Sequence, residues 1–303
     1  MTLRLGTRAS LLATTQSQWV ADRVRVATGH VVELVPIVSQ GDVLTGSLAS
    51  LGGTGVFASA LRDALLAGEC DFVVHSLKDL PTAPLPGVHL AAVPERESAR
   101  DALCSGGFGG LASLPEGARI GTGSPRRVAQ LLRARPDLKP SDIRGNVDTR
   151  LGKVASGEFD AVVLAEAGLR RIGRHEEIRE VFALDVVPTS AGQGALAIEA
   201  REHDAVVRNV LEAIDDPVVH RHALLERAVL ARLEAGCAAP LGISVVDGQL
   251  IAEVYSPDGA AALRAEGTLA NPERDELLVV ELVTQLLDAG ANEIAPLGSE
   301  SGR

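Results

Sequence analysis

Short apolar runs alternate with amphipathic segments in the first part of the chain. The runs predict strands, and the segments between them, whose apolar residues recur at helical spacing, predict helices. The predicted strands are 3–6, 31–38 and 71–75, and the predicted helices are 10–27 and a segment through Phe57, Leu61 and Leu65. Because strands separated by helices are typical of parallel sheets, we expect an α/β fold.

The same alternation begins again near Asp101. It predicts strands at 118–122 and 160–165, helices at 125–135 and 148–156, a short helix that ends at Ile172, and a further strand within 186–201. Acidic residues before Pro217 indicate the start of a helix that runs to Gly236. The rest of the pattern predicts short strands between 241 and 269 and an amphipathic helix over 272–288.

The composition is that of a soluble globular protein, with 303 residues, 46% of them apolar and 23% charged. No apolar run reaches the roughly 18 to 20 residues that span a bilayer, and the opening residues do not resemble a secretion signal. Three cysteines favour a reducing compartment. Seven Phe, Trp and Tyr residues leave little surface for stacking bases. We therefore expect a cytoplasmic protein, monomeric, without a nucleic-acid or membrane partner.

The net charge of −11 is unevenly distributed. Between Arg119 and Arg174 there are twelve Lys and Arg residues and six Asp and Glu residues, a local balance of +6, whereas the remainder of the chain carries −17. An acidic protein with one basic region is suited to hold a small anion rather than to coat DNA.

The segment GTGSPRR, residues 121–127, places positive charge where a helix disfavours it. Ser124 is a typical N-cap, and Pro125 suits the first helical position. Arg126 and Arg127 then lie in the first turn, where the helix dipole costs about 0.3–1 kcal/mol for each cation. A bound anion would offset this cost, and so would pairing with surface carboxylates; the segment alone leaves both possibilities open.

Three further turns carry the same kind of residue, two of them after a predicted strand. They contribute Arg8 and Ser10, then Arg144 and Arg150, and finally Arg170 and Arg171. Open α/β sheets bind ligands at the carboxyl ends of their strands. Because the guanidinium group matches a carboxylate with two hydrogen bonds, these turns predict a cleft for a polycarboxylate.

Lys78 and Asp79 follow the strand 71–75 and so belong to the same predicted cleft. A single carboxylate among cations can balance a developing positive charge or move a proton. Cys237 follows a helix stop, where the dipole does not lower a thiol pKa, and taken alone it is interpreted as structural. Cys70 and Cys104 adjoin apolar strands and are predicted to lie in the core. The sequence contains no GxGxxG, GxSxG or zinc-ligand spacing.

The order of seven motifs resembles the porphobilinogen deaminase (hydroxymethylbilane synthase) family over most of the chain. These motifs are LGTRAS (5–10), GVFASAL with HSLKDLP (55–61, 75–81), GTGSPRR (121–127), IRGNVDTRL (143–151), LAEAGLRRIG (164–173), SAGQGALAIEAR (190–201) and GCAAPLG (236–242).

The resemblance implies a transferase of tetrapyrrole (haem-type) biosynthesis that joins four porphobilinogen molecules head to tail, releases ammonia at each step and yields hydroxymethylbilane. It implies a dipyrromethane cofactor held by a thioether to Cys237, and no metal. Asp79 matches the catalytic aspartate, expected to be a buried carboxylate that stabilises the cation formed when ammonia leaves. The positions that match the carboxylate-binding residues are Arg8, Ser10, Lys78, Ser124, Arg126, Arg127, Arg144, Arg150 and Arg171.

The resemblance also implies two doubly wound domains like those of periplasmic binding proteins and a small α/β third domain. The expected boundaries are 1–95 plus 194–213 for domain 1, 99–189 for domain 2 and 216–303 for domain 3, with a mobile loop at 41–55. This chain departs from the family pattern at Thr54 and Ser59, where relatives often carry lysines, and at Ala238 and Ala239.

Two other functions stay open at this stage. A non-catalytic binding protein for a small polycarboxylate would share the fold and the arginine cleft. A cysteine-dependent hydrolase is disfavoured because no nearby histidine supplies a base. Intact mass separates the first alternative from the enzyme, since only the enzyme would weigh about two pyrrole units more than its polypeptide.

Overall fold

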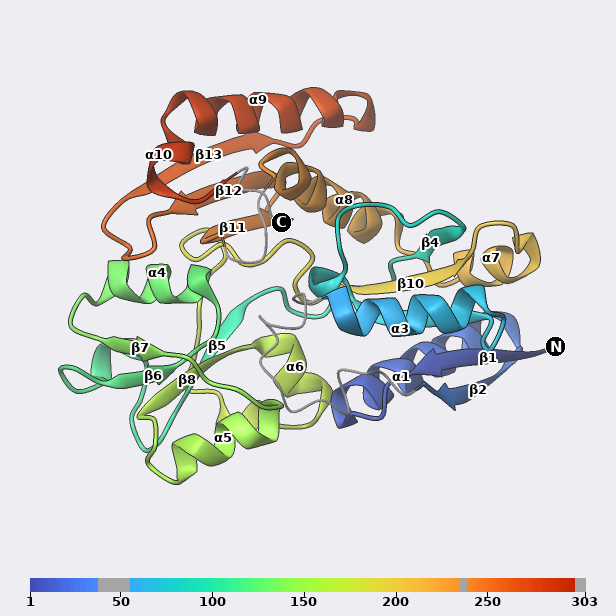
Figure 1. Ribbon diagram of the computed structural model, residues 1–303, viewed down its shortest axis with the longest axis horizontal. Coiled ribbons are helices and arrows are strands. Elements are labelled where there is room, and N and C mark those ends of the chain that lie inside the picture. Colours follow the sequence, from blue (N-terminus) through green and yellow to red (C-terminus); the bar gives the residue numbers. More distant parts are fainter. Residues whose placement is uncertain (38–54, 235–238, 298–303) are drawn as a thin grey trace. The chain divides into compact units, whose positions relative to one another are not determined.

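The structure is a computed structural model that describes residues 1–37, 55–234 and 239–297 (Figure 1). The chain divides into two compact units. The first unit comprises residues 1–97 and 194–223, and the second comprises residues 98–193 and 224–303. Within the described residues the strands form three sheets.

The sheet of the first unit has the strand order β2-β1-β3-β10-β4. Its strands are β1 (Thr2–Thr7), β2 (Val31–Pro36), β3 (Phe72–Ser76), β4 (Val88–Ala92) and β10 (Leu196–Arg201). β1 pairs in parallel with β2 and β3, whereas β10 runs antiparallel to both β3 and β4. The returning segment after residue 193 therefore completes the sheet that the first ninety residues began.

Helices pack on this sheet through apolar side chains. They are α1 (Leu11–Thr28), α3 (Gly55–Leu66), the 3-10 turn η2 (Leu77–Asp79) and α7 (Ala205–Glu212). In α1, Ser10 caps the first turn and Gly29 ends the helix with a left-handed φ of 74°. Val20 and Val24 of α1 are fully buried against Leu3 and Leu5 of β1 in one core cluster.

The first sheet of the second unit has the order β7-β6-β8-β5-β9. Its strands are β5 (Asp101–Ser105), β6 (Arg119–Gly121), β7 (Lys139–Ser141), β8 (Ala161–Ala165) and β9 (Glu180–Val181). β6 pairs in parallel with β7 and β8, and β5 runs antiparallel to β8. The accompanying helices are α4 (Pro125–Ala134), α5 (Val147–Ala155), α6 (Glu166–Arg171), η3 (Leu111–Ser113) and η4 (His175–Glu177).

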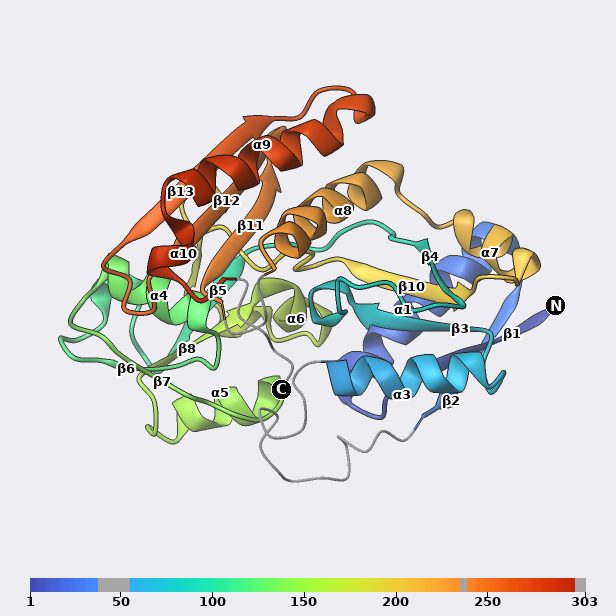
Figure 2. The same cartoon turned by 45° about the horizontal axis from the view of Figure 1, so that its top comes forward.

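The C-terminal part of the chain forms an antiparallel sheet with the order β11-β12-β13. It consists of β11 (Leu241–Val246), β12 (Gln249–Tyr255) and β13 (Ala262–Thr268), with α8 (Pro217–Arg232), η5 (Pro272–Arg274), α9 (Asp275–Asp288) and α10 (Ala291–Ile294). Figure 2 shows α9 lying along β13. Gly242 of β11 has no room for a side chain, since a Cβ there would lie 2.4 Å from the Pro188 carbonyl oxygen.

The α/β class expected from the sequence is confirmed, and the predicted helices and strands that fall on described residues are present. The expectation of parallel sheets is wrong in part, because β10 runs antiparallel to β3 and β4, and β5 runs antiparallel to β8. The pattern missed β4, β5, β7, β9, α7 and α10. Of these, β7 is only the three residues KPS, too short to show any periodicity. The division into three domains stays a prediction.

Cys70 and Cys104 are buried, as predicted. Burial raises the pKa of the Cys70 thiol to about 11 and that of the Cys104 thiol to about 12, so both are protonated at neutral pH. Among the described residues no helix combines the length and the apolar character that crossing a bilayer requires.

Candidate functional site

The first unit brings four of the predicted site residues to one edge of its sheet. β1 and β3 are parallel neighbours, so their carboxyl ends meet at the same edge. Arg8 and Ser10 follow β1, and Lys78 and Asp79 lie in η2, directly after β3. Sequence positions almost seventy residues apart are therefore juxtaposed by the sheet.

Each of these side chains has a defined local setting. The Ser10 hydroxyl accepts a hydrogen bond from the Ala13 N–H at 3.4 Å and so caps α1. Arg8 and Lys78 are half-buried, whereas Asp79 is exposed. The expectation that the Asp79 carboxylate is buried is wrong for the described structure, because η2 projects beyond the end of β3 and only Leu77 of that turn is buried.

The second unit gathers arginines at the corresponding edge of its own sheet. The parallel strands β7, β6 and β8 are neighbours, and an arginine-bearing turn or helix follows each of them. Arg126 and Arg127 follow β6, Arg144 and Arg150 follow β7, and Arg171 follows β8. The arginine-bearing motifs, which are far apart in the sequence, therefore lie at one edge of this sheet.

Arg126 and Arg127 pair with a buried carboxylate of the chain itself. Asp101, the first residue of β5, is 1% exposed and lies opposite Ala165 at the end of β8. Its Oδ2 accepts from Arg126 Nη1 at 2.8 Å and from Arg127 Nε at 3.1 Å, and its Oδ1 accepts from Arg127 Nη2 at 2.6 Å. The cost of two cations in the first turn of α4 is therefore offset in part from within, by a core carboxylate rather than by a surface one.

This arrangement shifts the pKa values of its members. Burial alone would raise the pKa of Asp101, but the charges of Arg126 and Arg127 outweigh burial and hold that pKa far below its usual range. Burial lowers the pKa of Arg126, and the charge of Arg127 lowers it further. Ser124 caps the same helix, where its Oγ accepts the Arg127 N–H at 3.5 Å.

Arg150 belongs to the same electrostatic neighbourhood. Burial lowers the pKa of its guanidinium group, and the positive charge of Arg127 lowers it further. Its Nε donates to the Gly145 carbonyl at 2.8 Å, which fixes the stem of the side chain. A partly buried cation held beside a second cation indicates a place where an anion would be stabilised.

The remaining arginines differ in their exposure. Arg144 is exposed, and its Nε donates to Asp142 Oδ2 at 3.1 Å. Arg171 is half-buried in the last turn of α6. Arg170 donates to the buried Glu166 with its Nε at 2.7 Å, which turns it toward that carboxylate.

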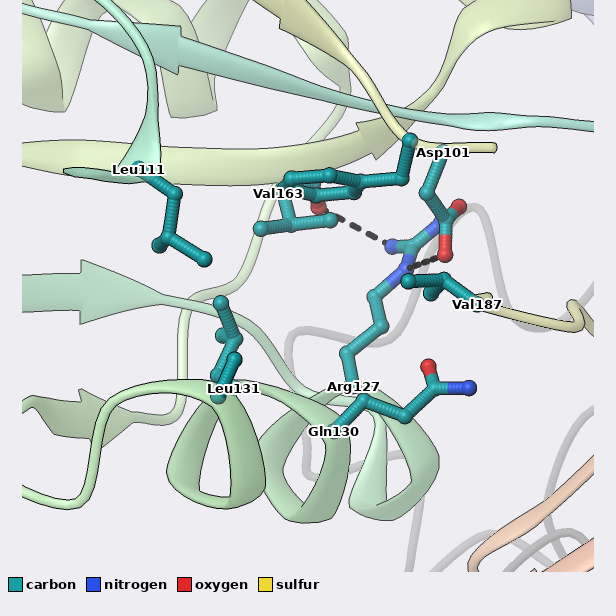
Figure 3. Close-up of a pocket in the computed structure, with 9 residues that line it drawn as sticks. Asp101, Leu111, Arg127, Gln130, Leu131, Val163 and Val187 are labelled. Atoms are coloured by element: carbon teal, nitrogen blue, oxygen red, sulfur yellow. Dashed lines mark hydrogen bonds and ion pairs between the residues drawn. The ribbon is translucent and has the colours of Figure 1, made fainter. Parts of the chain in front are cut away.

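A small apolar pocket lies behind the Arg127–Asp101 pair. Figure 3 shows Arg127 reaching from α4 to Asp101 and to the Val163 carbonyl oxygen, with Leu111 and Leu131 on the other side of the pocket. The volume is about 50 Å³. A cavity that holds a benzene ring measures roughly 150 Å³, so this pocket is too small for a pyrrole ring. Most of its remaining lining is apolar.

Two of the predictions fall outside the described residues. Cys237 lies in the segment 235–238, and the glycine-rich segment expected as a mobile loop, 41–55, lies almost wholly within 38–54. Their predicted roles stay predictions.

Sequence reasoning missed two groups of buried polar residues. Asp101 and Gln193 form one group, in which Gln193 Nε2 donates to Asp101 Oδ1 at 2.8 Å. Arg62, His75 and Glu199 form the other, in the core of the first unit. The available signal was a charged residue inside an otherwise apolar strand, as in DALCS and LAIEAR.

Comparison with known protein families shows which family this chain belongs to. The family model for porphobilinogen deaminase, dipyrromethane cofactor binding domain, matches residues 3–209, and that for the C-terminal domain of the same enzyme matches residues 221–288. The chain belongs to the porphobilinogen deaminase family. The resemblance inferred from the seven motifs is thereby confirmed, and the cofactor of the family is dipyrromethane.

Individual relatives of the porphobilinogen deaminase family extend over nearly the whole chain. A porphobilinogen deaminase from Leifsonia xyli is 52% identical and covers 97% of this chain and 94% of its own. A porphobilinogen deaminase from Thermobifida fusca is 51% identical and covers 96% of this chain and 95% of its own. Among solved structures, a periplasmic substrate-binding protein of an ABC transporter from Coxiella burnetii covers 75% of this chain and 95% of its own, with 17% identity and a TM-score of 0.46.

The residues of the second unit fit a cofactor whose pyrrole rings carry carboxylates. Arg126 Nε is buried, and no acceptor for it is found in the described part of the chain. Burial and the positive charge of Arg127 lower the pKa of the Arg150 guanidinium, a cost that a ligand carboxylate would relieve. A ligand that carries carboxylates, as this cofactor does, is therefore chemically suited to this edge.

Proposed function

We propose that this chain is a transferase that condenses four porphobilinogen molecules head to tail on a dipyrromethane cofactor, with loss of ammonia, and so yields hydroxymethylbilane. Its membership of the porphobilinogen deaminase family supports the activity. The observation that carries the site is the basic edge of the second unit, where three neighbouring strands each lead into an arginine-bearing segment.

The arginines bind the carboxylates of substrate and cofactor. Every porphobilinogen unit brings an acetate and a propionate, so a lengthening chain requires several cationic partners. Arg126, Arg127 and Arg150 supply them near the strand ends of the second unit, together with Arg144, Arg171 and the hydroxyl of Ser124. In the first unit Arg8, Ser10 and Lys78 supply further partners. Guanidinium groups suit this role because each binds a carboxylate through two parallel hydrogen bonds.

Asp79 is the residue that handles charge and protons at the reacting carbon. When ammonia leaves, the substrate becomes an electrophile that is cationic in its protonated form, and a nearby carboxylate lowers the energy of that charge. Asp79 can also accept the proton that the attacking pyrrole carbon must lose once the new carbon–carbon bond has formed. Its exposed position on η2 leaves the carboxylate accessible to a ligand.

Cys237 holds the cofactor through a thioether in this proposal. Bound dipyrromethane supplies the pyrrole carbon from which the product chain grows. A thioether needs the sulfur once, at attachment, so Cys237 requires neither a base beside it nor a lowered pKa. This accounts for a cysteine at a position that the sequence predicts to follow a helix stop, where no persistent thiolate is favoured.

We further propose that the enzyme works in the cytoplasm as a monomer, and that its partners are small molecules rather than nucleic acid or a membrane. The net charge of −11 opposes association with polyanions. The small number of aromatic residues also disfavours base stacking.

Intact-protein mass spectrometry of the wild type and of Cys237→Ser tests the proposal. Both proteins are expressed in cells that make porphobilinogen, and both are treated with an acidic reagent that colours dipyrromethane. The wild type should exceed its polypeptide mass by two pyrrole units and give the colour, whereas Cys237→Ser should do neither.

Cys70→Ser and Cys104→Ser are the matched controls, since both thiols are buried and protonated. They should retain the added mass in whatever fraction folds. A wild-type protein with the bare polypeptide mass and no porphobilinogen consumption would refute the enzyme and leave a polycarboxylate binder.

A further inference from the structure

Asp101 stands at the centre of a buried network that the proposed chemistry does not itself use. Both of its oxygens are occupied: Oδ1 accepts from Arg127 and Gln193, and Oδ2 accepts from Arg126 and Arg127. The side chain is 1% exposed. With four donors directed at one carboxylate, neither arginine can rotate without breaking a buried charge-assisted hydrogen bond.

The partners of Asp101 are themselves held in place. Arg126 Nη1 also donates to Gln130 Oε1 at 2.8 Å, and Gln130 Nε2 donates to the Pro188 carbonyl at 2.8 Å and to the Tyr255 hydroxyl at 3.0 Å. Gln193 Nε2 donates to the Ala99 carbonyl at 2.8 Å as well as to Asp101. The network thus ties α4 to the segments around residues 99 and 188–193, all within the second unit.

The charges within the network do not cancel. Arg126 and Arg127 are buried with exposures of 3% and 8%, and Asp101 is the carboxylate they share, so these three side chains carry one net positive charge. Arg126 Nε is buried without an acceptor in the residues that the structure covers. A buried cation with a spare donor is stable when one more anion binds beside it.

We propose that Asp101 is a positioning residue that holds Arg126 and Arg127 as a fixed pair able to receive one carboxylate of the pyrrole substrate or cofactor. A first ligand carboxylate neutralises the remaining positive charge, whereas a second would leave a buried negative charge. The Asp101 carboxylate therefore fixes the orientation of Arg126 and Arg127 and limits the pair to one ligand carboxylate. The inference rests on the proposed function.

Asp101→Asn tests the proposal because it keeps the shape of the side chain and removes its charge. The amide keeps one acceptor oxygen and turns the other position into a donor, so at least one pair of the four hydrogen bonds to this side chain is lost and the arginines are held less firmly, while the net charge of the three side chains rises from one to two. We expect the KM for porphobilinogen to rise about tenfold or more, with kcat within about threefold of wild type.

The dependence of KM on salt distinguishes positioning from a merely structural role. The additional positive charge in Asp101→Asn attracts the substrate at low salt and is screened at high salt. The ratio of its KM to the wild-type KM should therefore increase as salt is raised from about 0.02 to about 0.5 M. Over this range the Debye length falls from above about 10 Å to below it. A defect that arises only from a loosened fold would keep the same ratio to wild type at every salt concentration.

Asp137→Asn is the matched control. Asp137 accepts from Arg135 Nε and Nη2, both at 2.7 Å, so it is another carboxylate with a bidentate arginine partner, and it follows the carboxyl end of α4 rather than its beginning. This variant should keep the KM, kcat and salt dependence of wild type. Intact mass gives the cofactor-loaded fraction of every preparation, and all rates are normalised to it.

Gln193→Met covers the case in which Asp101→Asn does not fold. It removes one donor from Asp101 Oδ1 and leaves the charge unchanged, so KM should rise a few-fold and its salt dependence should match wild type. Wild-type KM and salt dependence in both variants would overturn the positioning role, as would a tenfold KM defect in Asp137→Asn. Absence of porphobilinogen consumption and of the dipyrromethane mass in the wild type itself would instead refute the proposed function.

Discussion

Asp79 shows how much of the proposed chemistry depends on one side chain at a strand end. It lies in a short 3-10 turn, where Leu77 is buried and anchors the turn while Asp79 is exposed. Because the carboxylate makes little contribution to the core, its replacement separates catalysis from stability. Few residues in a folded protein allow this separation so directly.

We expect Asp79→Ala to lower kcat by a factor on the order of 10² to 10³ or more, because a preorganised group that stabilises developing charge contributes about that much. Steady-state release of ammonia measures the rate, and urea unfolding should show a midpoint close to wild type. Asp63→Ala, which removes another exposed carboxylate of the first unit, is the control and should keep wild-type kcat. Wild-type turnover in Asp79→Ala would remove Asp79 from the mechanism.

At the scale of elements, buried ion pairs hold together segments that are far apart in the sequence. In the first unit, Glu199 of β10 accepts from Arg62 of α3, with Nε at 2.8 Å and Nη2 at 2.7 Å. His75 of β3 lies with its Nε2 3.2 Å from Glu199 Oε2. All three side chains are buried, so the network fixes the returning strand β10 against both α3 and the strand that leads to Asp79.

Glu199→Gln should destabilise the first unit by about 3–5 kcal/mol at neutral pH, because it leaves the Arg62 cation buried without its counter-ion. Burial raises the pKa of Glu199, but hydrogen bonds from Arg62 and His75 outweigh burial and lower it to about 2. A depressed pKa stabilises the fold above the usual value of 4.5, and this contribution disappears as the pH falls toward about 2.

Urea unfolding of both proteins between pH 7 and pH 3 measures the effect. The stability difference between wild type and Glu199→Gln should be constant near neutral pH and should shrink below about pH 4.5. Glu95→Gln serves as the control, since Glu95 pairs with Arg23 on the surface, and it should cost at most about 1 kcal/mol. A difference that does not change with pH would show that Glu199 is not ionised in the native protein.

For the molecule as a whole, charge and surface composition both bear on association. The chain carries a net charge of −11, and much of its positive charge is concentrated between Arg119 and Arg174. The exposed large apolar side chains come from many elements, with Leu11, Val26, Val186 and Val206 among the most exposed. Isolated apolar residues of this kind are normal on monomeric proteins.

Sedimentation equilibrium should therefore give one species near 31.5 kDa, plus the mass of any bound cofactor. Because mutual repulsion between acidic copies is screened by salt, the measurement is made at both low and high ionic strength. The mass should be the same at both. A species of twice that mass at either ionic strength would contradict the proposed monomer.

The sequence by itself predicted most of the longer elements and supplied the residues proposed for the site. Helical spacing of apolar residues predicted α1, because that helix buries one face. Short apolar runs predicted β3 and β8, because both faces of these strands are buried. Cap residues such as Ser10 and Ser124 marked helix starts, since they satisfy backbone N–H groups locally. Arginines after strands indicated an acidic ligand, and the seven motifs identified the family.

Tertiary structure alone decided the pairings between distant segments. Asp101 with Arg127 and Glu199 with Arg62 are separated by 26 and 137 residues, so no local pattern joins them. The antiparallel directions of β10, which lies between β3 and β4, and of β5, which lies between β8 and β9, are likewise set by pairing with distant segments. Local preferences follow from neighbouring residues, whereas the partner of a buried charge is chosen by the low-dielectric core, which forces each cation to find an anion wherever the chain has one.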